Sequence, residues 1–313
     1  MNASHRDIAV LLMAMGGPSA LEEVEGFLSR FLEGRLPSRE RVEEIKRKYG
    51  LIGGGSPLPA ITIKQAQKLE AELARRGHEL PVFAALRFSK PSVSDAVNQA
   101  MARGIRRLMA LPLALHRSSL STEPYFVALE RAMAEQNTPC NVFRITGWHT
   151  HWQFVEALNE KIAEGLSRFN ADVADTVQII FSAHSLPEKA VGEEPYVGEI
   201  RETIQAVRQR FSRLTWHLAF QSRGGGSGAW LGPDVEEVLG DLARKGCQRV
   251  LVVPVGFVSD HLETLYDLDI KYREQAEALG MEYGRSPSLN DSSRFIQALA
   301  EIVLERLEKL ENA

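Results

Sequence analysis

The sequence alternates short, unbroken apolar runs with longer segments of helical periodicity. The first apolar run extends from Ile8 to Ala14 and contains no polar residue. Such a run is typical of a parallel strand buried on both faces, because a strand with one solvated face would alternate apolar and polar residues. Successive parallel strands need crossover connections, which are usually helices. The alternation therefore predicts an α/β fold with parallel sheets flanked by helices.

The predicted elements form two series of similar rhythm, although no sequence repeat links them. Strands are expected at 8–14, 82–88, 105–115, 142–146, 177–183, 215–221, 249–256 and 281–284. Helices are expected at 21–31, 39–49, 61–76, 93–102, 124–134, 154–169, 195–211, 234–245, about 260–279 and 293–310. We predict two similar Rossmann-like lobes, residues 1–149 and 150–313, with the boundary in 147–153. A cleft between them would be lined by strand-end loops, and the last helix, 293–310, would pack back on the first lobe.

Composition excludes several classes of protein. A net charge of −4 argues against broad binding to a phosphate backbone. No apolar run approaches the roughly 20 residues of a membrane-spanning helix, and the polar start, Met1 to Asp7, predicts no signal peptide. Cys140 and Cys247 are far apart and form neither a CxxC pair nor an iron–sulfur framework. We expect a cytoplasmic protein with reduced cysteines.

A histidine follows one of the strongest predicted strands. His184 lies in a small polar turn, Ser182 to Pro187, directly after the apolar run 177–181. Ligands of open α/β sheets bind beyond the carboxyl ends of the strands, where this histidine is expected. A neutral imidazole there can accept a proton or bind a transition metal. The alternative is a loop histidine that only bonds to backbone. Other strand ends carry Met15, Arg87 and His116.

The stretch 259–267 holds several ionisable residues after the strand 249–256. On a regular helix, Glu263 and Asp267 share a face, and Lys271 continues that row. His261 lies about 200° from Glu263 on such a helix, so both would face one ligand only if the turn is irregular. An acidic helix N-terminus that complements the helix dipole is the alternative explanation, and it suits Asp260 better than Glu263.

His184 and Glu263 together could bind a divalent metal transiently or perform acid–base chemistry. They are too few for a closed structural metal site, and the HExxH spacing is missing. The glycine clusters at 53–55 and 224–228 lack the pattern of a phosphate-binding loop, so nucleotide binding is not expected. No GxSxG elbow is present either. Trp230 follows the second cluster, where it could pack internally or stack on a planar ligand.

Five segments of the chain resemble the ferrochelatase family, whose members insert Fe²⁺ into a porphyrin to make haem. They are 15–18, 52–58, 182–187, 221–223 with 230–233, and 256–266, in this order along nearly the whole chain. The resemblance implies a chelatase-like fold of two lobes around a porphyrin cleft. It also implies that His184 and Glu263 are catalytic, face the centre of the porphyrin and contact the metal.

Further roles follow from the same resemblance. Met15, Trp230 and His116 would contact or approach the porphyrin, and Asp267 would continue an acidic path for protons or metal. Arg87 and Arg117 are candidate contacts for the propionates. Fe²⁺ is expected as a substrate, with no permanently bound cofactor and no iron–sulfur cluster, because no cysteines follow Cys247. We expect a monomer or weak dimer that binds no nucleic acid, and a peripheral membrane contact is left open.

Three positions depart from the family pattern. Lys271 stands where many relatives have a third acid, so it would end the acidic row and lend its charge to Asp267. Ala229 replaces a frequent proline, and the small residues of 224–228 predict a mobile loop. Met15 stands where relatives that use coproporphyrin often have tyrosine, which favours protoporphyrin IX. The alternatives are a coproporphyrin III ferrochelatase, a chelatase for cobalt or nickel, and a non-catalytic porphyrin or haem carrier.

Overall fold

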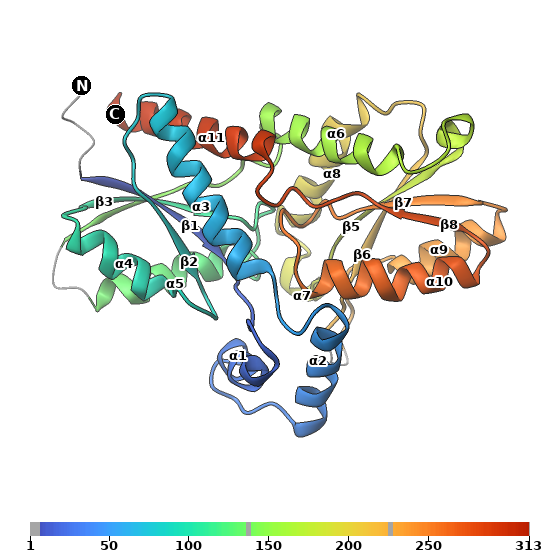
Figure 1. Cartoon of the computed structure of the whole chain (residues 1–313), viewed down its shortest axis with the longest axis horizontal. Coiled ribbons are helices and arrows are strands. Elements are labelled where there is room, and N and C mark those ends of the chain that lie inside the picture. The colour runs from blue at the N-terminus through green and yellow to red at the C-terminus, as the bar shows by residue number, and fades with distance from the viewer. Residues whose placement is uncertain (1–6, 136–138, 225–227, 313) are drawn as a thin grey trace. The chain divides into compact units, whose positions relative to one another are not determined.

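The computed structural model describes residues 7–135, 139–224 and 228–312. Over these ranges the chain divides into two compact units. The first comprises the chain up to Leu115, Thr122–Trp148 and the residues from Asn290 onward, and the second comprises His116–Ser121 and His149–Leu289. Each unit is an α/β structure built around its own sheet (Figure 1).

In its described part, the first unit has one four-stranded parallel sheet in the order β2-β1-β3-β4. Its strands are β1 (Ile8–Ala14), β2 (Val82–Leu86), β3 (Arg107–Pro112) and β4 (Asn141–Arg144). Every residue of β1 is buried, as expected for a central apolar strand. Its helices are α1 (Val24–Phe31), α2 (Arg39–Leu51), α3 (Leu58–Arg75), α4 (Val93–Ala102), α5 (Glu123–Ala134) and α11 (Ser293–Glu311), with the short η2 (Leu21–Glu23).

The last helix of the chain covers the first sheet. Figure 1 shows α3 and α11 together on one face of this sheet, with α4 and α5 on the other. Arg76 at the end of α3 pairs with Glu301 of α11, at 2.5 Å between Nη1 and Oε2. The Gln65 amide donates to the Asn290 carbonyl at 2.8 Å. The C-terminal helix therefore completes the unit that the N-terminal strand begins.

The second unit repeats the strand order of the first. Within the described residues its parallel sheet has the order β6-β5-β7-β8. As in the first unit, the second strand in sequence is an edge strand and pairs with the first. The strands are β5 (Gln178–His184), β6 (Trp216–Gln221), β7 (Arg249–Val253) and β8 (Glu282–Arg285). The helices are α6 (Trp152–Leu166), η3 (Ala171–Thr176), α7 (Glu188–Val191), α8 (Tyr196–Arg208), α9 (Val235–Arg244), the π-helix η4 (Glu263–Lys271) and α10 (Tyr272–Ala278).

The parallel sheets and flanking helices confirm the predicted α/β class. The units differ from a single division at residue 149 in two places. Residues 116–121 belong to the second unit, because the Arg117 backbone and guanidinium both bond to Glu199 of α8. Residues from 290 onward belong to the first, through the α3–α11 contacts. Whether a cleft separates two lobes stays a prediction.

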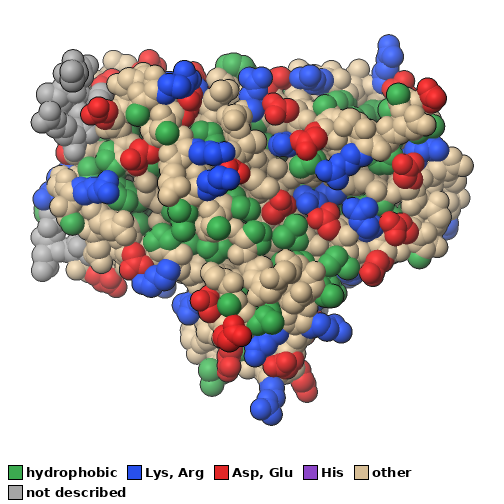
Figure 2. All heavy atoms as spheres, viewed as in Figure 1, with side chains coloured by type: hydrophobic (Ala, Val, Ile, Leu, Met, Phe, Trp, Pro, Cys, Tyr) green, Lys and Arg blue, Asp and Glu red, His purple; other side chains and the backbone are tan. Residues whose placement is uncertain are grey.

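The described residues show no sign of a membrane-spanning helix, and the face in Figure 2 shows no sign of one dominant charge. In the part of the chain that the structure describes, no helix is long and apolar enough to cross a membrane. On the face shown in Figure 2, basic and acidic side chains are interspersed among apolar and neutral ones. No broad patch of one charge dominates that face.

Candidate active site

The switch point of the second sheet lies between β5 and β7. The chain leaves β5 toward β6 on one side, then crosses back to β7 on the other, and ligands of such sheets bind at this reversal. His184 is the last residue of β5, and Glu263 begins η4 after the loop that follows β7. Gly256 lets that loop approach closely, because a Cβ there would lie 2.9 Å from the Ala183 Cα. The glycine therefore brings the two segments together.

His184 and Glu263 form the central contact of this site. The His184 Nδ1 lies 3.0 Å from a carboxylate oxygen of Glu263. A carboxylate can only accept, so Nδ1 carries the proton and the lone pair of a neutral ring lies on Nε2. The side chains keep 32% and 27% of their surface exposed, so a reactant can reach them. The structure therefore brings the two residues together, as the sequence suggested, and their catalytic and metal-binding roles stay predictions.

The pair stabilises its charged form. Burial opposes the charge on His184, but the Glu263 carboxylate outweighs it and raises the pKa of His184 above its usual 6.5. Burial likewise opposes the charge on Glu263, but His184 with its hydrogen bond, and to a lesser degree His261, hold the pKa of Glu263 far below its usual value. The carboxylate therefore stays ionised, and the imidazole readily holds a proton.

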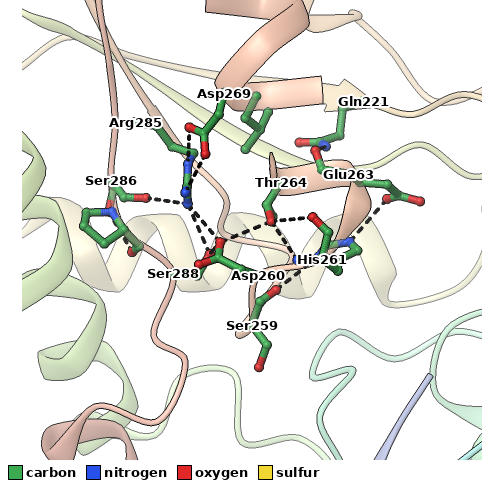
Figure 3. A network of polar contacts seen from close by, with 12 residues as sticks. Gln221, Ser259, Asp260, His261, Glu263, Thr264, Asp269, Arg285, Ser286 and Ser288 are labelled. Carbon is green, nitrogen blue, oxygen red and sulfur yellow. Dashed lines mark hydrogen bonds and ion pairs between the residues drawn. The ribbon is translucent and has the colours of Figure 1, made fainter. Parts of the chain in front are cut away.

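The helix that carries Glu263 is not a regular α-helix. Residues 263–271 form a π-helix, so the expected row of Glu263, Asp267 and Lys271 on one α-helical face was wrong in its geometry. The turn before it is irregular too, because the His261 Nε2 approaches the Glu263 carboxylate to 3.7 Å. His261 is buried, with Nδ1 3.1 Å from the Ser259 carbonyl (Figure 3). The turn is therefore irregular, as is required for His261 and Glu263 to face one ligand.

The two later members of the predicted row have other partners. Asp267 accepts a hydrogen bond from the Ser222 hydroxyl at 2.5 Å, beside the end of β6. The main partner of Lys271 is Glu236 of α9, and not Asp267. Burial opposes the Lys271 charge, but Glu236, and more weakly Asp267, raise its pKa. The path for protons or metal through Asp267 stays a prediction. The charge of Lys271 is balanced mainly by Glu236 of α9.

Two residues that support the pair were not predicted. Gln221 is fully buried at the end of β6, where its amide oxygen accepts from Ser182 and its nitrogen donates to the Glu263 carbonyl, at 2.7 and 3.1 Å. A polar residue closing an apolar strand was the available signal. Tyr196 donates its hydroxyl proton to the His184 carbonyl at 2.9 Å. Nothing in its sequence surroundings pointed to this contact.

Trp230 is tied to the loop that follows His184. It forms an antiparallel bridge with Pro187, and Leu231 N donates to the Leu186 carbonyl at 2.9 Å. Gly224 lies against the indole, since a Cβ there would meet the ring at 2.6 Å. The loop that was expected to be mobile includes residues 225–227, which lie outside the described residues. A contact of Trp230 with a porphyrin stays a prediction.

His116 and Arg117 lie in a polar cluster of the second unit. His116 is buried, and its Nε2 lies 3.0 Å from the Thr203 hydroxyl. Burial, together with nearby His149, lowers the pKa of His116 to about 3, so the ring is neutral. The Arg117 guanidinium pairs with buried Glu199 at 2.5 Å. These internal partners give both residues a structural role, and their porphyrin contacts stay predictions.

Met15 and Arg87 lie at strand ends of the first unit. Met15 follows β1 directly and is half-buried, and its carbonyl accepts from the Phe88 N–H at 3.0 Å. The Arg87 guanidinium lies over the rings of Phe88 and Tyr125, at 4.5 and 5.3 Å. Burial lowers the pKa of Arg87. Both residues thus follow the carboxyl ends of β1 and β2, the edge of such sheets at which ligands bind.

The described residues contain no group of three or more His, Cys, Asp or Glu side chains that could hold a metal ion. His184 and Glu263 offer two ligands, and His261, with Nε2 3.7 Å from the Glu263 carboxylate, does not complete such a group.

These features define an α/β protein with two parallel sheets and a histidine–carboxylate pair at the switch point of the second. The solved structure of SirB from Bacillus subtilis with Fe3+ matches over 98% of each chain with a TM-score of 0.61, and its 12% sequence identity shows the fold alone. The ferrochelatase family model matches residues 7–307.

Two curated relatives agree with that match. A ferrochelatase of Geotalea uraniireducens is 40% identical, over 94% of this chain and 96% of its own length. A protein named coproporphyrin III ferrochelatase, from Geobacillus sp., is 35% identical over 97% and 99%. The chain therefore belongs to the ferrochelatase family. Its activity is that of a metal chelatase, which inserts iron into a porphyrin, and a carrier without turnover is set aside.

Proposed function

We propose that this enzyme inserts Fe²⁺ into protoporphyrin IX to form haem b, with His184 and Glu263 as the catalytic pair. The observation that carries the proposal is the 3.0 Å contact between His184 Nδ1 and the Glu263 carboxylate at the switch point. Metallation replaces two pyrrole N–H protons by one Fe²⁺, so two protons must leave for each iron that enters. A base supported by an ionised partner meets that requirement.

The protonation states of the pair suit this chemistry. With Nδ1–H donated to Glu263, the neutral His184 presents the Nε2 lone pair, which accepts a pyrrole proton or contacts the incoming iron. Once Nε2 is protonated, the carboxylate stabilises the imidazolium and keeps the ring oriented. The Tyr196 bond to the His184 carbonyl and the Gln221 bond to the Glu263 carbonyl hold both backbones in place. After the proton passes onward, the ring can accept the second one.

The choice of porphyrin rests on Met15. Protoporphyrin IX carries two vinyl groups and two propionates, whereas coproporphyrin III carries four propionates. A half-buried thioether favours an apolar vinyl substituent over a charged carboxylate, because burying an unpaired charge is costly. The alternative substrate is coproporphyrin III, which is favoured by the name of the Geobacillus relative. Arg87 is proposed to meet one propionate, and Trp230 to stack on the macrocycle.

Anaerobic mixing of the purified protein with Fe²⁺ and each porphyrin tests the proposal, with the haem absorption bands as readout. We expect a higher kcat/KM for protoporphyrin IX. Met15→Tyr should lower this preference at least about threefold, whereas Met15→Leu, which keeps an apolar side chain, should preserve it. A higher kcat/KM for coproporphyrin III in the unaltered protein would reverse the assignment of substrate. The predicted cytoplasmic location, weak self-association and lack of a resident cofactor stay predictions.

A further inference from the structure

Arg285, the last residue of β8, binds two aspartates on either side of the start of the π-helix. Its Nη1 lies 3.1 Å from Asp260, and its Nε and Nη2 lie 2.6 and 2.8 Å from the two oxygens of Asp269 (Figure 3). The three side chains keep only 11%, 16% and 27% of their surface exposed. We call Arg285, Asp260 and Asp269 the arginine clamp.

The clamp is connected to the residues next to Glu263. Asp260 also accepts from the Ser288 hydroxyl at 2.7 Å and lies 3.2 Å from the Thr264 hydroxyl. Thr264 in turn accepts from the His261 backbone N–H at 3.0 Å and is fully buried. Thr264 directly follows Glu263 in the sequence, and His261 precedes it by two positions. A shift of Asp260 would therefore move the turn that carries Glu263.

The clamp also links this turn to a helix of unusual geometry. π-helical turns are rare, and a stretch of nine residues needs support from its surroundings. Asp260 precedes the helix, in the turn that leads into it, whereas Asp269 lies within the helix. One guanidinium therefore binds the turn and the helix at the same time. The bidentate bond to Asp269 and the single bond to Asp260 thus fix the π-helix against the turn before it.

We propose that Arg285 is a positioning residue, which fixes η4 to the turn before it and so keeps the Glu263 carboxylate against His184. The inference rests on the proposed role of Glu263. Arg285 does not touch the reacting atoms, and its effect passes through the turn 260–264. The planar guanidinium is needed because its fork bonds both oxygens of Asp269 while Nη1 reaches Asp260. A lysine offers one point of charge and cannot make the three contacts together.

Arg285→Gln tests the clamp in the full-length enzyme, with Arg285→Lys as the conservative change. We expect kcat to fall at least tenfold in Arg285→Gln. In Arg285→Lys, kcat should lie between that of the unaltered enzyme and that of Arg285→Gln. KM and the fluorescence-measured affinity for the porphyrin should stay within twofold. Arg249→Gln is the matched control, since Arg249 pairs with Glu282 where the parallel strands β7 and β8 begin, at the other end of β8 from Arg285. That variant should keep kcat and KM within twofold.

A combined variant separates positioning from a general loss of structure. If Arg285 acts through Glu263, adding Arg285→Gln to Glu263→Gln should lower kcat by less than a further twofold. An equal further loss in the combined variant, or an unchanged kcat in Arg285→Gln with only a lower melting temperature, would overturn the inference. Should Arg285→Gln not fold, Asp269→Asn decides by the same criteria. Full activity of Glu263→Gln alone would instead refute the proposed catalytic pair.

Discussion

Nδ1 of His184 lies 3.0 Å from Oε2 of Glu263, although 79 positions separate the two residues in the sequence. The contact arises because β5 and β7 are neighbouring parallel strands, so the segments that follow them emerge at the same edge of the sheet. A close pair of base and carboxylate at this edge makes specific demands on variants of either residue.

His184→Ala should abolish most of the insertion activity while the porphyrin still binds. The variant loses the Nε2 base, and general-base catalysis typically contributes about 100-fold or more in rate. Haem formation followed by absorbance gives the rate, and quenching of porphyrin fluorescence gives the affinity. His217→Ala is the control, because its ring bonds to Gln178 on the neighbouring strand and lies outside the pair. Full turnover by His184→Ala would show that another group is the base.

Glu263→Gln should reduce kcat by at least about tenfold, which corresponds to about 1.4 kcal/mol of barrier. The amide has nearly the same shape but no charge, so it cannot stabilise the imidazolium that forms when His184 takes a proton. Steady-state rates at saturating porphyrin measure the effect. Glu282→Gln removes an exposed carboxylate that pairs with Arg249, and it should leave kcat unchanged. A rate equal to that of the unaltered enzyme would reduce Glu263 to a structural residue.

The stability provided by the pair should depend on pH. The raised pKa of His184 means that its contribution is full below its usual 6.5 and is lost as the pH rises through the raised value. Because the pKa of Glu263 is lowered, its stabilisation is full above its usual 4.5 and is lost as the pH falls through the lowered pKa. The pair therefore stabilises most between pH 4.5 and 6.5.

Urea unfolding of the unaltered protein and Glu263→Gln measures this dependence. The difference in their free energy of unfolding should be larger at about pH 5.5 than at about pH 9. A difference that does not change, or that grows toward alkaline pH, would contradict an ion pair whose histidine loses its proton.

Lys271→Glu should leave the rate of iron insertion intact or raise it, because it adds a carboxylate near Asp267. The lysine pairs with Glu236 at the surface, where such a pair is worth only about 0–1 kcal/mol. The melting temperature should therefore change little. Lys271→Gln separates loss of the cation from gain of an acid. Complete loss of activity in Lys271→Glu would mean that the ammonium group itself takes part in the reaction.

Much of the fold could be predicted because buried parallel strands appear in the sequence as unbroken apolar runs. Ile8–Ala14 is β1 as predicted, and His184 closes β5 at the expected edge. The adjacency of His184 and Glu263 follows from two strand ends and a known rule of sheet topology. These features depend on local composition and on the order of elements, both of which are readable in a sequence.

The remaining features depend on distant contacts. Periodicity does not distinguish the π-helix of Glu263 from an α-helix, and the contact of Asp269 in this helix with Arg285 of β8 links residues 16 positions apart. The bond between Lys271 and Glu236 needs the packing of η4 beside α9. Likewise, the exchange of 116–121 into the second unit depends on a buried carboxylate, Glu199, that no local pattern reveals.

The position of α11 has a consequence for synthesis on the ribosome. The second unit has all its residues once Leu289 has emerged, whereas the first still lacks the helix that covers its sheet beside α3. Domains usually fold in the order in which they are translated. In this chain the half that is made first must wait for the final helix to bury that face, and the half that is made second can finish before it.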